Sequence, residues 1–290
     1  MEKYNKNNQL IRLDWAMKYM LRDKANFVIL EGFLSALLKE NITIIEILES
    51  ESNAKNDTLK YNRVDMLVKD SLNRKFIIEV QNEKESNYLE RLLFGTSKII
   101  TEYLKIGDQY NKVSKVISIG ILYFNVPYAD DYLYYGTTDI KGIHSGNRIA
   151  FKHPVIKNIE NNATDIFPEY YIIDLPKFAD EIKDDIDEWV YIFKNNVSLT
   201  EFKSKNIKEA IERLHFINME NDKQKEYEDF LLNLASEEDV IETAKKDGES
   251  IGIAKGKIEM AKAMLSEGLP IDLIVRVSGI NIKEIEQLIC

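Results

Sequence analysis

The stretch RVDMLVKDSLNRKFIIEVQ, from Arg63 to Gln81, decides the fold of this chain. It predicts two strands, over residues 64–69 and 75–81, because both runs are rich in β-branched and large apolar side chains. The four residues between them, Asp70-Ser71-Leu72-Asn73, are typical of a turn. We therefore expect an antiparallel hairpin centred on Leu72, in which cross-strand partners lie equally far from that residue.

This register brings two carboxylates together. Asp65 and Glu79 would face each other with β-carbons roughly 5 Å apart, and Gln81 would share the face of Glu79 because side chains alternate along a strand. At an effective dielectric of about 20 the two charges repel by about 3 kcal/mol. Two alternatives relieve that repulsion: both acids lie at solvated strand ends, or they share a hard divalent cation such as Mg²⁺.

Composition and charge describe a globular chain. The 290 residues are 44% hydrophobic and 30% charged, and the net charge is −10. That charge argues against broad, non-specific adhesion to nucleic acid, although it leaves room for a locally basic surface. A single cysteine, Cys290, excludes a disulfide framework, and the three histidines lack ligand spacing.

Two further features bear on location. The first twelve or so residues, MEKYNKNNQLIR, have no signal-peptide core. The longest apolar run, near residues 116–126, is too short to cross a bilayer. We expect a soluble, cytoplasmic protein with no membrane partner.

Flanking elements give a mixed helix and strand order. Residues 14–38 predict a helix with a break near 22–24, residues 42–48 a strand, and residues 87–104 a second helix. Asp14 either caps the first helix or reaches a metal site. The apolar face expected for the second helix contains Leu89, Leu92, Leu93, Thr96, Ile99, Ile100, Tyr103 and Leu104.

Arg91 lies off that face, where it is either solvated or within reach of a phosphate. Residues 113–124 are nearly all apolar, as in a central strand covered on both sides. A helix between two strands of one sheet favours a parallel, right-handed crossover.

The second half is less regular and then helical. Residues 127–168 predict an irregular segment with a tyrosine cluster that either forms a packed lid or stacks on bases; the cluster consists of Tyr128, Tyr132, Tyr134 and Tyr135. A short strand over 169–174 and an amphipathic helix over 183–194 follow.

From residue 198 the sequence predicts helices throughout. Gly248, Gly252 and Gly256 recur at every fourth residue, which suggests the approach of another helix and hence a homo-oligomer. Residues 270–278 and 281–289 predict a small helix-turn-helix, whose acidic second helix favours packing or dimerisation over major-groove reading.

The order helix, strand, strand, strand, helix, strand, with Asp65 on the second strand and Glu79-Val80-Gln81 on the third, resembles the PD-(D/E)XK nuclease superfamily. More narrowly, the chain resembles the Rpn family of recombination-promoting nucleases, also described as PD-(D/E)XK family transposases. Four stretches in the family's order carry this resemblance: LDWAMKYML; RVDMLVKD with FIIEVQ; YYIIDLPKF followed by DEWVYIF; and the tail GESIGIAKGKIEMAKAML–SEGLPIDLIVRVSGINIKEIEQL.

The resemblance implies an α/β fold in two parts. Residues 1–197 would form a restriction-endonuclease-like core, a mixed sheet flanked by helices. The α-helical C-terminal region, residues 198–290, would follow it, and the glycine spacing in that region suggests self-association. It implies that Asp65 and Glu79 bind Mg²⁺, with Mn²⁺ as a substitute, that Val80 contributes its carbonyl, and that Asp14 is a helix-borne acid.

The chain departs from the superfamily pattern at Gln81, which stands where a lysine is usual; Val64 also replaces the motif's proline. Glutamine supplies only a dipole, whereas lysine supplies a positive charge. The metal would therefore contribute more to activating the attacking water than it does in a site with lysine. The resemblance implies a metal-dependent endodeoxyribonuclease acting in recombination, mobile DNA or phage defence, in which Gln81 is catalytic with Asp65 and Glu79. The alternative is a catalytically weak or inactive DNA-associated binding or assembly module; RNA as the substrate is a third option.

Overall fold

The structure, a computed structural model, describes most of the chain in two compact units, Met1–Gln224 and Lys225–Cys290. The described residues are 10–19, 21, 23–48, 66–82, 84–85, 87–103, 109–110, 113–126, 129–152, 160–162, 166–197, 199 and 201–288.

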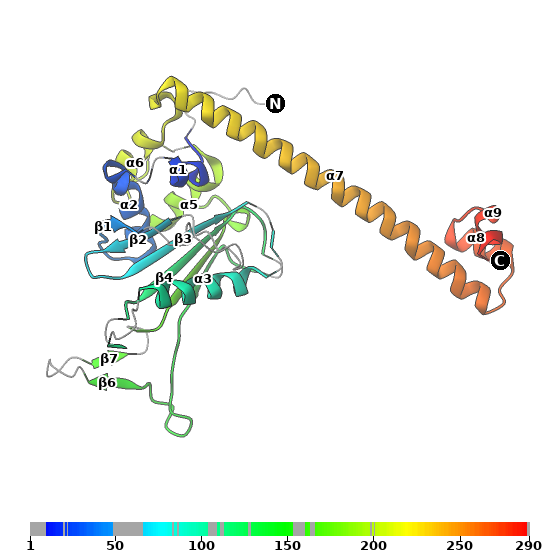
Figure 1. The fold of residues 1–290 in the computed structure, drawn as a ribbon, viewed down its shortest axis with the longest axis horizontal. Coiled ribbons are helices and arrows are strands. Elements are labelled where there is room, and N and C mark those ends of the chain that lie inside the picture. Colours follow the sequence, from blue (N-terminus) through cyan, green and yellow to red (C-terminus); the bar gives the residue numbers. More distant parts are fainter. Residues whose placement is uncertain are drawn as a thin grey trace. The chain divides into compact units, whose positions relative to one another are not determined.

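A mixed six-stranded sheet forms the centre of the first unit, in the order β1-β2-β3-β4-β8-β5 (Figure 1). Its strands are β1 Ile44–Ile47, β2 Met66–Asp70, β3 Lys75–Gln81, β4 Val116–Leu122, β5 Leu133–Gly136 and β8 Glu169–Asp174. The central strands β3, β4 and β8 are parallel, whereas β1, β2 and β5 run antiparallel to their neighbours. The predicted parallel crossover between β3 and β4 is therefore confirmed.

The hairpin of β2 and β3 has the predicted register. Its partners, each pair equally far from Leu72, are Met66 with Ile78, Leu67 with Ile77, Val68 with Phe76 and Lys69 with Lys75. The turn is held by Asp70, whose Oδ1 accepts hydrogen bonds from the backbone N–H groups of Leu72 and Arg74. Val64 and Asp65 lie outside the described residues.

Helices cover both faces of the sheet. The helix α3 (Tyr88–Glu102) lies on one face, and α1 (Leu13–Tyr19), α2 (Phe27–Leu38), α5 (Asp185–Asn195) and α6 (Ile207–Leu214) lie on the other (Figure 1). The predicted break between α1 and α2 is a short 3₁₀ turn, Lys24–Asn26, capped by Asp23. Phe33 of α2 packs edge-on against Phe193 of α5, at a ring-centroid distance of 5.1 Å.

The predicted apolar face of α3 is buried only in part. Leu92, Thr96 and Ile99 are buried, but Leu89 and Leu93 are 64% and 58% exposed. The helix packs over the middle of the sheet, where Ile99 meets Leu67 and Ile77. Its two exposed leucines lie toward β8 and the edge strand β5 instead, where they line a groove described below.

The prediction that residues 127–168 are irregular is wrong in part. The segment contains β5 at the sheet edge and a two-stranded ribbon of β6 (Ala150–Lys152) and β7 (Glu160–Asn162). These strands have three or four residues each, too few for an alternating pattern to stand out. β5 is an edge strand fixed by distant pairing with β8, in which Tyr134 faces Ile172.

The N-terminal segment is fixed by residues late in the first unit. The Leu10 N–H donates to the carbonyl of Asn196, at 2.8 Å, and the Ile11 N–H to that of Leu214, at 2.7 Å. α6 also packs against α2. The first unit accordingly continues to Gln224, beyond the sequence-based division after residue 197, and the functional division of the chain stays a prediction.

The second unit is helical, as predicted. The end of α7 (Asn221–Ser266), α8 (Ile271–Ser278) and α9 (Ile282–Gln287) share a small core of Ala261, Ile274, Ile280 and Ile285. A β-carbon added at Gly248, Gly252 or Gly256 would meet no heavy atom within 4 Å beyond the adjoining backbone of its own helix, and the predicted self-association stays a prediction. In the part of the chain that the structure describes, no helix is long and apolar enough to span a membrane.

Candidate active site

Glu79 is an acid in an apolar strand. Its side chain is 1% exposed, near the carboxyl end of β3, whose other residues as far as Val80 are also buried. Its partner on β4 is Gly120. Gln81 follows on the same face of β3 and is half-buried. A buried carboxylate is costly unless charged or polar groups compensate it, so the surroundings of Glu79 decide its role.

Tyr88 and Gly120 shape the floor beside Glu79. A β-carbon on Gly120 would lie 1.7 Å from the hydroxyl oxygen of Tyr88 and 2.9 Å from its Cζ. The Tyr88 ring therefore lies directly over β4, on the strand next to Glu79. A larger residue at position 120 would therefore displace the Tyr88 side chain.

Arg91 is the cation that the described structure brings to Glu79. Its Nε lies 3.9 Å from Glu79 Oε2, and its guanidinium also pairs with Glu85. Arg91 is 28% exposed while Glu79 is nearly inaccessible. Arg91 is thus partly buried between two acids, and its role toward a phosphate stays a prediction.

Asp14 lies at the same end of the sheet but has four hydrogen-bond donors. Its Oδ1 accepts from the Trp15 N–H at 2.9 Å and from Arg12 Nε at 3.3 Å. Its Oδ2 accepts from Arg12 Nη2 at 3.1 Å and from Asn82 Nδ2 at 3.0 Å. A metal ion at Asp14 would have to replace one of these donors. The arrangement ties α1 to the residue that follows Gln81.

Arg12 and Asn82 complete this network and were not predicted from the sequence. Arg12 Nη2 donates to Asn82 Oδ1 at 2.8 Å, and its guanidinium lies 4.2 Å from the ring centroid of Tyr123. The Tyr123 hydroxyl in turn donates to the carbonyl of Phe193 on α5, at 2.9 Å. Their positions in the sequence could have indicated both residues, because Arg12 precedes Asp14 by two residues and Asn82 directly follows Gln81.

The donor set suits a hard divalent cation. Glu79, Gln81 and the Val80 carbonyl all offer oxygen, the ligand that Mg²⁺ prefers. Among the described residues, no three His, Cys, Asp or Glu side chains gather where they could hold a metal ion. The second acid expected from the sequence, Asp65, lies outside them.

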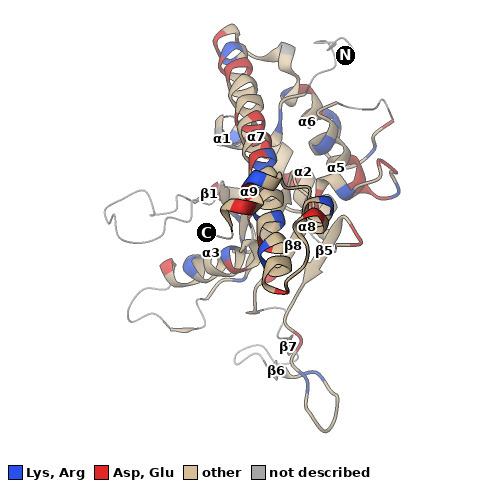
Figure 2. Ribbon diagram, turned by 90° about the vertical axis from the view of Figure 1, so that its right-hand side faces the viewer, with Lys and Arg blue, Asp and Glu red and all other residues tan. Residues whose placement is uncertain are grey.

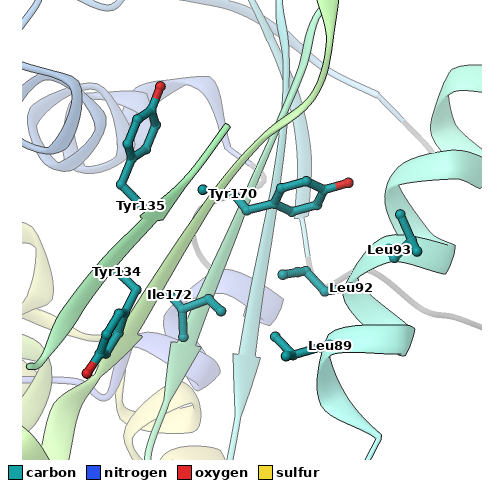
Figure 3. A pocket seen from close by; sticks show the side chains of 8 residues that line it. Leu89, Leu92, Leu93, Tyr134, Tyr135, Tyr170 and Ile172 are labelled. Carbon is teal, nitrogen blue, oxygen red and sulfur yellow. The ribbon is translucent and has the colours of Figure 1, made fainter. Parts of the chain in front are cut away.

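An apolar groove of about 340 Å³ lies on the Glu79 face of the sheet, beyond β4. Figure 3 shows Leu89, Leu92 and Leu93 of α3 turned toward Tyr170 and Ile172 of β8. Gly120 is the β4 partner of both Glu79 and Ile172, so two strand spacings, roughly 10 Å, separate Glu79 from this groove.

The predicted tyrosine cluster is dispersed. Tyr134 lines the groove, and the Tyr135 ring packs on Tyr171 at a centroid distance of 4.9 Å. The Tyr132 hydroxyl bonds to Asp187 of α5, and burial and that bond raise its pKa. Tyr128 lies outside the described residues. Packing thus accounts for Tyr132 and Tyr135.

Comparison with known proteins agrees with the fold. A profile of the family described as PD-(D/E)XK nuclease family transposase matches residues 11–244, which include Asp14, Glu79 and Arg91. No curated protein and no solved structure gave a match. Nucleases of this kind generally use divalent metals, and membership supports a nuclease or mobile-DNA role. The chain belongs to the PD-(D/E)XK nuclease family transposases.

Proposed function

We propose that this protein is a Mg²⁺-dependent endonuclease that hydrolyses phosphodiester bonds in DNA. The observation that carries the proposal is Glu79, a carboxylate that is 1% exposed at the carboxyl end of a central strand, in a chain that belongs to a nuclease family. Burial of this acid costs free energy, and metal binding is a function that compensates the cost.

The proposed metal ligands are Asp65, Glu79 and the carbonyl of Val80, with Mn²⁺ able to replace Mg²⁺. Four described pairs of the β2–β3 hairpin follow one register. The sequence-based prediction that Asp65 faces Glu79 uses this same register, which supports the proposal of a shared metal. A bound divalent ion would supply positive charge for the phosphate and lower the pKa of water.

The remaining groups position the substrate. Gln81 lies on the face of Glu79 and orients the attacking water or a phosphate oxygen through its amide. Arg91, held by Glu79 and Glu85, adds positive charge beside the phosphate. Asp14 fixes the end of β3 through Asn82. The biological role, in recombination, mobile DNA or phage defence, is proposed from the family alone.

The test is cleavage of supercoiled plasmid by the full chain, with Mg²⁺, Mn²⁺ or EDTA, and with an RNA of similar length offered in parallel. We expect nicked and linear DNA with either metal, none with EDTA and no cleavage of the RNA. Cleavage in EDTA that equals cleavage in Mg²⁺ would contradict metal dependence. Preferential cleavage of RNA would contradict the proposal that DNA is the substrate.

Gln81 favours one alternative, a weakly active or inactive protein that works by binding DNA. The position lacks the cationic side chain usual in the superfamily, so charge neutralisation in the transition state is weaker. This alternative predicts tight binding of plasmid DNA without cleavage in either metal.

A further inference from the structure

A hairpin arm projects from the edge of the sheet. It begins after β5 ends at Gly136 and returns into β6, and all of residues 139–149 are exposed. The arm is held by backbone hydrogen bonds within itself. The Ile149 N–H donates to the carbonyl of Ile140, and the Gly142 N–H donates to the carbonyl of Asn147, both at 2.9 Å. Lys141 and Arg148 form an antiparallel bridge. Backbone hydrogen bonds therefore hold the arm together without a core beneath it, and the exposed side chains of residues 139–149 are available to a partner.

The arm is basic in an acidic chain. Residues 137–152 contain Lys141, Arg148 and Lys152 but a single acid, Asp139, whereas the whole chain carries a net charge of −10. Figure 2 shows the basic positions on this projecting segment. Charge of this sign, on the part of the first unit that reaches furthest from the sheet, is complementary to phosphate.

Asp139 forms ion pairs with both Lys141 and Arg148. Its carboxylate lies 2.8 Å from Lys141 Nζ and 2.9 Å from Arg148 Nε, and these partners lower its pKa. The side chains of Lys141 and Arg148 are 53% and 72% exposed. Ion pairs this exposed contribute little, so a phosphate can replace Asp139 at either cation.

The tip of the arm is apolar. Ile143 is 96% exposed in the turn, and no packing in the described structure accounts for a β-branched apolar side chain there. The seven residues after Gly136, as far as Ile143, span up to roughly 23 Å at the rise of an extended strand. A ribbon of two strands fits the major groove of B-DNA, which is about 12 Å wide.

We propose that this arm enters the major groove of duplex DNA, with Lys141 and Arg148 on phosphates and Ile143 against base edges. The inference rests on DNA as the substrate in the proposed function. β5 runs antiparallel to β8 and hence to β3, so the arm leaves the sheet from the end opposite Gln81. It contacts DNA away from the bond that is cleaved.

The experiment measures binding without cleavage. Fluorescence anisotropy with the full chain, EDTA and a labelled duplex of about three helical turns, roughly 30 base pairs, gives affinity over a range of KCl concentrations. Replacing both cations, Lys141→Ala with Arg148→Ala, should lower affinity on the order of tenfold at low salt. It should also reduce the slope of log affinity against log salt by about 0.9 for each phosphate that the protein no longer neutralises.

Three further variants sharpen the test. Ile143→Ala should lower affinity without changing the salt slope, because an apolar contact releases no counterion. Asp139→Asn should raise affinity, because it removes the internal competitor for the two cations. Lys183→Ala is the matched control: its side chain is 75% exposed and also pairs with an acid, Glu181 at 3.0 Å, and it should bind DNA as wild type does.

Each outcome decides between the two proposals. Wild-type protein that binds and cleaves DNA, with unchanged binding by the arm variants at wild-type melting temperatures, overturns the role of the arm and leaves the nuclease standing. Arm variants that alter sedimentation but not DNA binding also overturn it, in favour of a protein contact. A wild-type chain that neither binds nor cleaves DNA overturns both.

Discussion

Asn82 donates a side-chain hydrogen bond to the carboxylate of Asp14, at 3.0 Å, although the two residues are separated by 68 positions in the chain. Arg12 donates to both partners, so the three side chains close a small network. The network joins the start of α1 to the residue after Gln81. It fixes the carboxyl end of β3, on which the proposed chemistry depends.

This link predicts that Asn82→Ala impairs cleavage more than it impairs folding. Hydrogen bonds to charged groups contribute about 1.5–3 kcal/mol, and misplacement of a site by about 1 Å costs on the order of 10² in rate. Initial cleavage rates and urea denaturation measure the two effects separately.

Asn26→Ala is the control for Asn82→Ala, because Asn26 Oδ1 accepts from Arg213 at 3.1 Å on a different part of the unit. It should lose stability but keep the cleavage rate per folded molecule. An Asn82→Ala protein that retains the full rate would show that the network only supports the fold.

Gly120 provides a steric test of the site. Gly120→Ala would place a β-carbon 1.7 Å from the Tyr88 hydroxyl oxygen, so the Tyr88 side chain, which lies beside the strand of Glu79, must shift. Overpacking of this kind costs roughly 1–3 kcal/mol. We expect a lower melting temperature and weaker cleavage, measured by thermal unfolding and plasmid nicking.

Gly136→Ala is the matched control for Gly120→Ala, since its added β-carbon would meet Tyr170 at an ordinary 3.6 Å. It should melt near the wild-type temperature. Equal melting temperatures for the two variants would refute the close approach of Tyr88 to β4.

Sequence reasoning predicted the hairpin register because a turn of Asp70 to Asn73 and two apolar strands leave few other pairings. It also placed Glu79 and Arg91 on adjoining elements, because the helix that carries Arg91 directly follows the strand of Glu79. It missed Arg12 and Asn82 because their partners are set by tertiary packing, which local patterns do not encode. It missed β5 because a short edge strand depends on pairing with β8, far along the chain.

The hydrogen bonds of the N-terminal segment predict how much of the chain cleavage requires. Ile11 donates to the carbonyl of Leu214, so Arg12 and Asp14 depend on residues beyond 197. A shortened chain ending at Gln224 should fold and retain cleavage, whereas one ending at Asn196 should unfold at lower urea concentration and lose activity. Full activity in a stable chain ending at Asn196 would contradict this dependence.

Gln81 tests how the site manages without a lysine. Gln81→Ala should lower the cleavage rate by roughly 10²–10³, the usual cost of one positioned donor. Gln81→Lys restores the usual charge and should keep or raise the rate, with a higher Mg²⁺ requirement if the ammonium repels the ion. Metal titrations of cleavage measure both. Loss of all activity in Gln81→Lys, with normal melting, would show that the neutral amide is essential.

The most direct test of the nuclease account is Glu79→Gln, compared with Glu169→Gln, in a Mg²⁺ titration of plasmid cleavage. Both acids are buried in the same sheet and each has a cation nearby: Glu79 lies 3.9 Å from Arg91, and Glu169 lies 2.7 Å from Lys115. The account predicts that both variants melt cooperatively, that Glu169→Gln cleaves, and that Glu79→Gln loses cleavage by a factor on the order of 10³ or more. Cleavage by a folded Glu79→Gln at the wild-type rate would contradict it.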